Sequence, residues 1–144
     1  SNFILLVAVV TGFVRGSAAI SLCHMMYLNA DNDLEEFIVE DVEELLGNSA
    51  FLGKAGYSLH VLIDRHESYS GIVLGNSYHS NGAARTRENE GAVQYTYSGG
   101  KLVEVDQASV IGETNMDSKE TLEKFLKDAL SKCKDAQADT YFLQ

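Results

Sequence analysis

The chain has 144 residues, of which 45% are hydrophobic and 22% are charged, so it can bury a core and does not have the composition of a disordered segment. Its 21 acidic residues outnumber its 11 basic ones, giving a formal net charge of -10. Because an acidic surface repels phosphate groups, we expect no nucleic-acid partner and no anionic lipid partner. A cationic substrate and simple solubility are both compatible with this charge.

The chain starts with a short apolar run. Phe3 to Val10 (FILLVAVV) is continuously apolar, and small residues follow from Gly16 to Ala19. This order is typical of a secretory signal peptide, so we expect residues 1–19 to be a truncated signal peptide and the protein to be secreted or extracytoplasmic. The run is too short for a membrane span, which needs about 20 apolar residues. The alternative is a buried strand at the edge of the fold, because no basic segment precedes Phe3.

The spacing of apolar residues next predicts a strand, a helix and a second strand. Ile20 to Leu28 (ISLCHMMYL) is an apolar run of strand length. From Asp33 the apolar residues recur at steps of three and four, which predicts a helix that ends at Gly47 and Asn48, with Glu35 among its polar residues. Tyr57 to Ile63 (YSLHVLI) is the second strand. This order, with short connections, indicates a parallel unit of an α/β fold.

A β-hairpin is expected after a long loop. Residues 66 to 91 are rich in Gly, Ser and Asn and show no lasting period, which indicates a loop. The runs Val93 to Tyr97 and Lys101 to Val105 then flank Ser98-Gly99-Gly100, a turn with glycines where positive φ is needed.

The last part of the chain predicts a helix and a third strand. Apolar residues repeat at helical spacing from Leu122 to Cys133, and Asp117 with Glu120 offers a capping box at the start of this helix. Tyr141 to Leu143 then opens a third apolar strand. Because the sequence stops inside that element, we expect the domain to be incomplete at its C-terminus and this strand to be unpaired.

The cysteines and histidines do not form a motif. Cys23 falls in the first strand and Cys133 in the last helix, a separation that does not suggest a metal site. We expect two buried structural thiols, with a disulfide as the alternative. The spacing also assigns no Ser or Cys nucleophile to a histidine, so we expect structural roles for all four: His24, His60, His66 and His79.

Short polar residues follow both strands of the parallel unit. They are Asn29, Asp31, Asn32 and Asp33 after the first strand, and Asp64 and Arg65 after the second. Because ligands of open α/β sheets bind outside the carboxyl ends of the strands, we expect these residues at one rim, where they could hold a cation. Arg65 could pair with Asp31, Asp33 or Asp64. The alternative is that these residues only form turns and helix caps.

The acidic spacing of Asp31, Asp33 and Glu35 lacks the glycine and the distal Glu of an EF-hand, so we do not expect an EF-hand calcium site.

Three segments resemble the clostripain-like cysteine peptidase family. They are YLNADNDLE from Tyr27, VLIDR from Val61, and GETNM from Gly112 with the helix that contains Phe125-Leu126, and they occur in the family's order. The resemblance covers residues 20 to 144. It implies an α/β fold with a caspase-like sheet, flanking helices and a β-hairpin insertion, incomplete at the C-terminus. Residues 20–144 would then be the N-terminal part of a peptidase domain.

The resemblance also implies an activity. Members of the family cleave protein or peptide substrates after Arg or Lys with a His/Cys dyad. The His would follow the strand that begins at Tyr141, in a His-Gly motif, and the Cys would end a later strand; neither motif is present. We therefore transfer no catalytic residue and expect the segment to be inactive without its partner, the missing C-terminal part of the same domain. Family members are often processed into two chains, so the segment could also represent a light chain.

The loops after the early strands border the substrate cleft in caspase-like enzymes. The resemblance therefore implies that Asn29, Asp31, Asn32 and Asp33 shape this cleft, with Asp64 and Arg65 as structural neighbours. No cofactor is expected with certainty, and calcium stays open. Two other functions remain: a non-catalytic caspase-like binding module or pseudo-enzyme, and an unrelated α/β binding domain for a cationic ligand, which would have a complete sheet.

Overall fold

The computed structural model describes residues 21–48, 52, 56–65, 77–78, 91–98, 100–105 and 114–144. The expected signal peptide, residues 1–19, and most of the expected loop, residues 66–91, lie outside them. The described elements are β1 (Leu22–Ala30), α1 (Glu35–Gly47), β2 (Tyr57–Arg65), β3 (Ser77–Tyr78), β4 (Gly91–Ser98), β5 (Lys101–Glu104), α3 (Lys119–Asp135) and β6 (Thr140–Leu143). The strands form one mixed sheet in the order β3-β5-β4-β2-β1-β6.

The centre of the sheet is the expected parallel unit. β1 and β2 run parallel, with Leu22 opposite Tyr57 at one end and Ala30 opposite Arg65 at the other. The strand, helix and strand predicted from residue 20 onward are therefore confirmed, with boundaries moved by about two residues, as helix and strand ends often are. Both strands are apolar on both sides because each face of the sheet is covered by a helix.

The last strand is paired, which corrects the expectation of an unpaired strand. β6 runs parallel to β1, with Thr140 opposite Leu22 and Leu143 opposite Met25. The ladder continues to Gln144, whose N–H donates to the carbonyl of Met25 at 2.9 Å. β1 has two hydrogen-bonding edges, and β2 occupies one of them while β6 occupies the other.

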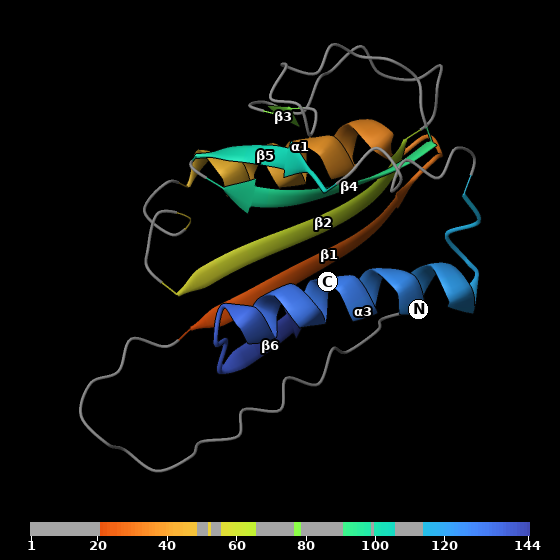
Figure 1. The fold of residues 1–144 in the computed structure, drawn as a ribbon. Coiled ribbons are helices and arrows are strands. Elements are labelled where there is room, and N and C mark those ends of the chain that lie inside the picture. The colour runs from red at the N-terminus through yellow and green to blue at the C-terminus, as the bar shows by residue number, and fades with distance from the viewer. Residues whose placement is uncertain are drawn as a thin grey trace, which may run out of the picture.

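α1 and α3 lie on opposite faces of this sheet (Figure 1). Side chains of a strand alternate between faces, so each inner strand contributes to two cores. The core on the α1 face contains Met26, Val39, Val42, Leu59, Val61, Ile63, Val93, Tyr95 and Leu102. The core on the α3 face contains Cys23, Met25, Leu62, Ala92, Met116, Phe125, Ala129 and Cys133.

The expected hairpin is present on the other side of β2. β4 pairs antiparallel with both β2 and β5, and the turn includes Gly100 at a φ of +86°, where a side chain would be strained. One short element was not predicted: β3 adds two residues, Ser77 and Tyr78, parallel to β5. A strand of two residues has no period, which is why a sequence pattern could not reveal it.

The helix predicted near the C-terminus is confirmed, but its N-cap is not. Phe125, Ala129 and Cys133 are buried, as their spacing predicts. The N-cap is Ser118, whose Oγ accepts a hydrogen bond of 3.1 Å from the N–H of Thr121. Asp117 belongs to the preceding turn, where its own N–H donates to Asn115 Oδ1 at 3.0 Å. The capping box predicted from Asp117 is therefore wrong by one position.

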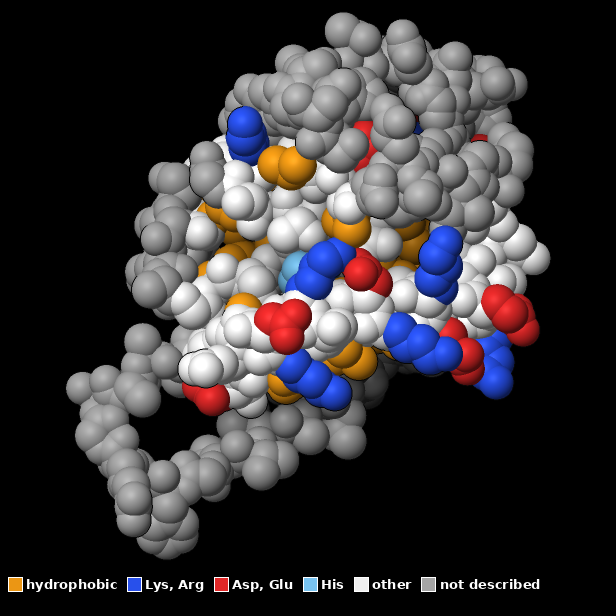
Figure 2. All heavy atoms as spheres, in the orientation of Figure 1, with side chains coloured by type: hydrophobic (Ala, Val, Ile, Leu, Met, Phe, Trp, Pro, Cys, Tyr) orange, Lys and Arg blue, Asp and Glu red, His pale blue; other side chains and the backbone are white. Residues whose placement is uncertain are grey.

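The outer side of α3 carries charges of both signs. Figure 2 shows Lys and Arg side chains interspersed with Asp and Glu over this side of the molecule. Lys119 lies 3.3 Å and Lys127 3.8 Å from Glu123, each one helical turn away. These contacts mark a solvated helix surface. Within the described ranges, no helix is long and apolar enough to cross a membrane.

Candidate functional site

The two polar clusters meet at one rim of the sheet, as expected. The parallel register places Asn29 opposite Asp64 and Ala30 opposite Arg65, so the carboxyl ends of β1 and β2 coincide. Asn29, Asp31 and Asp33 are exposed there, whereas Asp64 is only 5% exposed. The rim therefore combines exposed acidic and amide side chains with the buried carboxyl group of Asp64.

The pleat of β2 directs Asp64 and Arg65 to opposite faces of the sheet. Asp64 shares the α3 face with Leu62, and its negative charge contributes to the raised pKa of Tyr27, after burial and the charge of Asp117. Arg65 shares the α1 face with Ile63. Asp64 and Arg65 therefore share the predicted rim but lie on different faces of the sheet.

Glu35 is a residue of this rim that the sequence did not indicate. Its side chain is fully buried, and its Oε1 accepts a hydrogen bond of 2.6 Å from Arg65 Nε. The prediction of an aspartate partner for Arg65 missed this bond, because helical spacing assigned Glu35 to the polar side of α1. Glu35 is the first residue of α1, where a carboxylate is favoured by the helix dipole and where the chain still lies close to the sheet.

Asn32 has the structural role that was the alternative to a site. Its Nδ2 donates to the carbonyl of Asn29 at 3.0 Å, and its Oδ1 accepts from the N–H of Leu34 at 2.8 Å. Such a turn stops β1 and begins α1. Asp31 and Asp33 flank Asn32 and leave their side chains exposed at the rim. Among the predicted cleft residues, they are therefore the two exposed carboxylates.

A second cluster lies on the α3 face and corrects the expectation for the cysteines. Cys23 of β1 and Cys133 of α3 form a disulfide, with a Cα–Cα distance of 5.7 Å across a sequence separation of 110. Both residues are buried, as predicted, but they are not free thiols. Packing of α3 on β1 brings them together, and no sequence spacing reveals such a contact. Ser58 Oγ lies 3.7 Å from Cys133 Sγ.

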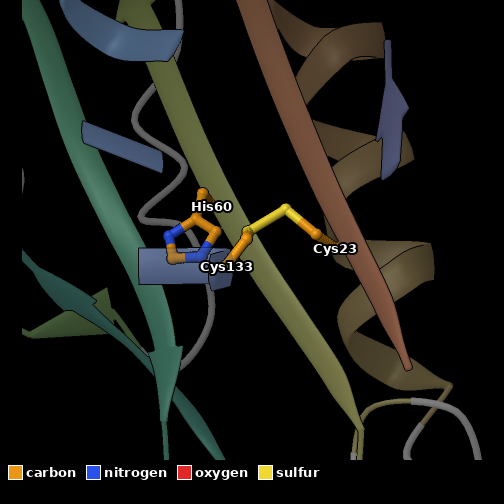
Figure 3. A group of neighbouring side chains, drawn as sticks. All are labelled: Cys23, His60 and Cys133. Atoms are coloured by element: carbon orange, nitrogen blue, oxygen red, sulfur yellow. A yellow bond between two sulfur atoms is a disulfide. The ribbon is translucent and has the colours of Figure 1, made fainter. Parts of the chain in front are cut away.

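His60 lies beside this disulfide (Figure 3). Its side chain is only 2% exposed, and its Nδ1 lies 3.2 Å from Thr96 Oγ1 on β4. Nε2 has no hydrogen-bond partner among the residues that the structure describes. Burial lowers the pKa of His60 to about 4; the positive charge of Lys132 also lowers it, and the negative charge of Asp128 opposes the shift. His60 is therefore a neutral imidazole at neutral pH.

His24 occupies the opposite face of the sheet. Its Nδ1 lies 2.7 Å from Tyr57 Oη, and its ring centroid lies 4.9 Å from that of Phe142 on β6. Burial lowers the pKa of His24, a hydrogen bond between His24 and Gln144 opposes this shift, and burial raises the pKa of Tyr57 to about 12. Both strand histidines are thus packed in the structural setting that was expected. His66 and His79 lie outside the described residues.

Within the described part of the chain, the only three His, Cys, Asp or Glu side chains close enough to hold an ion are Cys23, His60 and Cys133. None of these three is a rim carboxylate. The exposed charge of the rim carboxylates can attract a cationic group from solution.

The arrangement of elements defines an α/β fold with a parallel centre, a helix on each face and an antiparallel hairpin at one side. A solved structure of similar fold is a B. fragilis cysteine protease, with a TM-score of 0.50 and 18% sequence identity over 83% of each chain. This likeness confirms the expected caspase-like α/β fold. No protein-family model matches the chain. No curated protein matches it either.

Proposed function

We propose that the chain is the N-terminal segment of a secreted clostripain-like cysteine endopeptidase that cleaves after Arg or Lys. The observation that carries this proposal is the likeness in fold to the B. fragilis cysteine protease over 83% of the chain. The peptidase-like segments from Tyr27 and Val61 form the carboxyl ends of β1 and β2, where an α/β fold binds its ligands. The disulfide is of the kind found in oxidising compartments, which supports secretion.

The catalytic dyad of this endopeptidase would lie outside the segment. The chain has two cysteines, and both are in the disulfide, so no thiolate is available as a nucleophile. β6 runs parallel to β1, so residues that continue β6 would reach the rim of Asn29 and Asp64. A His-Gly motif after the Tyr141 strand would therefore arrive beside the proposed cleft.

The proposed mechanism divides the work between the two parts of the domain. A thiolate from the later part attacks the scissile carbonyl, a histidine protonates the leaving amine, and backbone N–H groups stabilise the oxyanion. The segment described here supplies the sheet and one border of the cleft. Asn29, Asp31 and Asp33 contact the substrate, and Asp31 and Asp33 favour a cationic side chain by charge pairing. Asn32 holds the turn in place.

Two other predicted residues support this border from within. Asp64 is buried opposite Asn29 in the register, and Arg65 forms an ion pair with the buried carboxylate of Glu35. The rim therefore presents negative charge where a substrate Arg or Lys would lie. Its partners are a protein or peptide substrate and the later part of the same domain.

The test compares the full gene product with the isolated 144-residue chain. Peptides that differ only at the residue before the scissile bond, Arg, Lys, Gln or Leu, serve as substrates. We expect the full product to cleave after Arg and Lys, and the isolated chain to cleave none of them. A downstream sequence without His-Gly and a later Cys, or turnover by the isolated chain, would refute the proposal.

A second candidate is a non-catalytic caspase-like binding module or pseudo-enzyme. It is favoured by one observation, the use of both cysteines in a disulfide. The same gene product distinguishes the two functions, because a binding module would retain Arg-containing peptides without hydrolysing them. Inspection of the downstream codons for the His and Cys gives an independent answer.

A further inference from the structure

The disulfide and His60 form a compact group that the proposed peptidase chemistry does not use. Cys23 comes from β1, His60 from β2 and Cys133 from α3, and their ligand atoms all lie within 4.8 Å of one another. All three side chains are almost completely buried, at 0%, 2% and 0% exposure. Figure 3 shows one ring nitrogen of His60 turned toward Cys133.

The hydrogen bonds of His60 leave one nitrogen for a ligand. Nδ1 lies 3.2 Å from Thr96 Oγ1, directly across the β2–β4 pairing, where His60 is opposite Thr96. When Nδ1–H donates to this hydroxyl, Nε2 carries a lone pair, and this atom has no hydrogen-bond partner among the described residues. An outer hydrogen bond on one nitrogen is the usual way in which proteins orient a histidine that binds a metal through the other.

We propose that Cys23, Cys133 and His60 form a redox-gated site that binds one soft monovalent d10 ion, Cu⁺, when the disulfide is reduced. Two thiolates are soft ligands of the kind that select Cu⁺, and imidazole is a nitrogen ligand that also suits copper. The described residues supply three such ligands in a dry setting, whereas a structural zinc site almost always needs four. This inference does not rest on the proposed function.

The gating follows from the balance of the reaction. A dithiol reductant transfers two electrons and two protons to the Cys23–Cys133 bond, which breaks to two thiols while the reductant closes to its own disulfide. Binding of Cu⁺ then displaces the two thiol protons, and the neutral imidazole of His60 adds its Nε2 lone pair. The disulfide form and the metal form therefore exclude each other.

The experiment uses the whole chain under anaerobic conditions. One sample is reduced, freed of reductant and assayed for two thiols, and another sample is kept oxidised. Both are titrated with Cu⁺ against a coloured competing chelator. We expect one equivalent of Cu⁺ per reduced chain, none on the oxidised chain, and protection of both thiols from alkylation. The proposal would be overturned if the reduced and the oxidised chain took up equal amounts of Cu⁺. It would also be overturned if the reduced chain took up less than one equivalent.

Two histidine variants separate a ligand from a packing residue. His60→Ala should lower the affinity for Cu⁺ by about tenfold or more and should remove the protection from alkylation. His24→Ala is the matched control, because His24 is also a buried strand histidine but lies on the opposite face of the sheet. The affinity of this variant for Cu⁺ should be unchanged. Equal affinities of the two variants would refute the role of His60.

The proposal stays testable if reduction unfolds the chain. The site exists only in the folded state, so Cu⁺ binding then has to restore the helical circular dichroism of the reduced chain. Recovery in the parent chain but not in Cys23→Ser supports the site. Failure of Cu⁺ to restore the fold overturns it.

Discussion

Arg65 Nε donates a hydrogen bond of 2.6 Å to Glu35 Oε1, joining the end of β2 to the first residue of α1. The Glu35 side chain has no exposed area, and that of Arg65 is 18% exposed. Glu35 directly follows the turn that carries Asp31 and Asp33. It therefore anchors the rim to the sheet through a charge pair rather than through apolar packing.

Removal of one partner should destabilise the fold strongly. Arg65→Met leaves the buried carboxylate of Glu35 without its hydrogen bond to Arg65, and such a loss costs about 3 kcal/mol. Glu35→Leu with Arg65→Met should recover part of that cost, because no charge is then buried. Urea denaturation of the parent chain, the single variants and the double variant measures the coupling energy between Glu35 and Arg65.

Lys119→Met is the matched control, because the exposed pair of Lys119 with Glu123 is worth less than about 1 kcal/mol. A stable Arg65→Met variant would contradict this role.

His60 should make the fold sensitive to acid. Its pKa is about 4 in the folded chain and about 6.5 for an unperturbed histidine, so between these values the unfolded state binds more protons than the folded state. Stability is therefore retained above pH 6.5 and lost as the pH falls toward 4, by about 3 kcal/mol from this residue. Unfolding free energies at stepped pH values measure the slope. His60→Gln should flatten it over this range, and an identical slope in the variant would disprove the prediction.

The disulfide should stabilise the folded chain. It closes a sequence separation of 110 residues, for which restriction of the unfolded state predicts about 5 kcal/mol. The double variant with Cys23→Ala and Cys133→Ala should lose this free energy of unfolding, and its urea midpoint should fall accordingly. A reducing agent should shift the midpoint of the parent chain and leave that of the double variant unchanged. Equal midpoints in all these conditions would show that the bond does not contribute.

The N-cap of α3 provides a smaller, local test. Ser118→Ala removes the acceptor for the N–H of Thr121 and should cost about 1 kcal/mol. Asp117→Ala should cost only a few tenths of that, because Asp117 precedes the cap and offers at most a favourable charge near the helix start. Thermal or urea unfolding of the two variants ranks them. The reverse order would restore the capping box that the sequence predicted from Asp117.

The exposed acidic residues of the rim should govern substrate charge in the full gene product. Asp31→Asn with Asp33→Asn should lower kcat/KM for Arg and Lys peptides by about tenfold, as expected when a charge-assisted contact is lost. Hydrolysis of a peptide with Gln at the same position should change little. Asp41→Asn, in the middle of α1, is a matched exposed control. Equal losses for charged and neutral peptides would indicate a structural role instead.

The regular parts of the fold were predictable from the sequence because their signals are local. Helical spacing identified the buried side of α3, and the apolar runs identified β1, β2 and the hairpin. The common rim of Asn29 and Asp64 followed from the rule that parallel strands end together. The opposite directions of Asp64 and Arg65 were also available from the strand period of two.

The remaining features depend on contacts between distant parts of the chain. The bond between Cys23 and Cys133 requires α3 to lie on β1, and burial of Glu35 requires the start of α1 to lie against the end of β2. The pairing of β6 with β1 is likewise a choice among free strand edges, which local composition does not specify. These are tertiary relationships, and a single sequence without a fold contains no direct signal for them.

The position of β1 between β2 and β6 sets an order of assembly during synthesis. β1, α1 and β2 can associate once residue 65 has left the ribosome, whereas α3 and β6 are made much later. Until then, Cys23, Met25 and Leu62 form an apolar surface without its covering helix. The nascent chain therefore passes through a stage in which one side of its sheet is open to chaperones or to other chains. Formation of the disulfide marks the end of that stage, because it requires α3 in place.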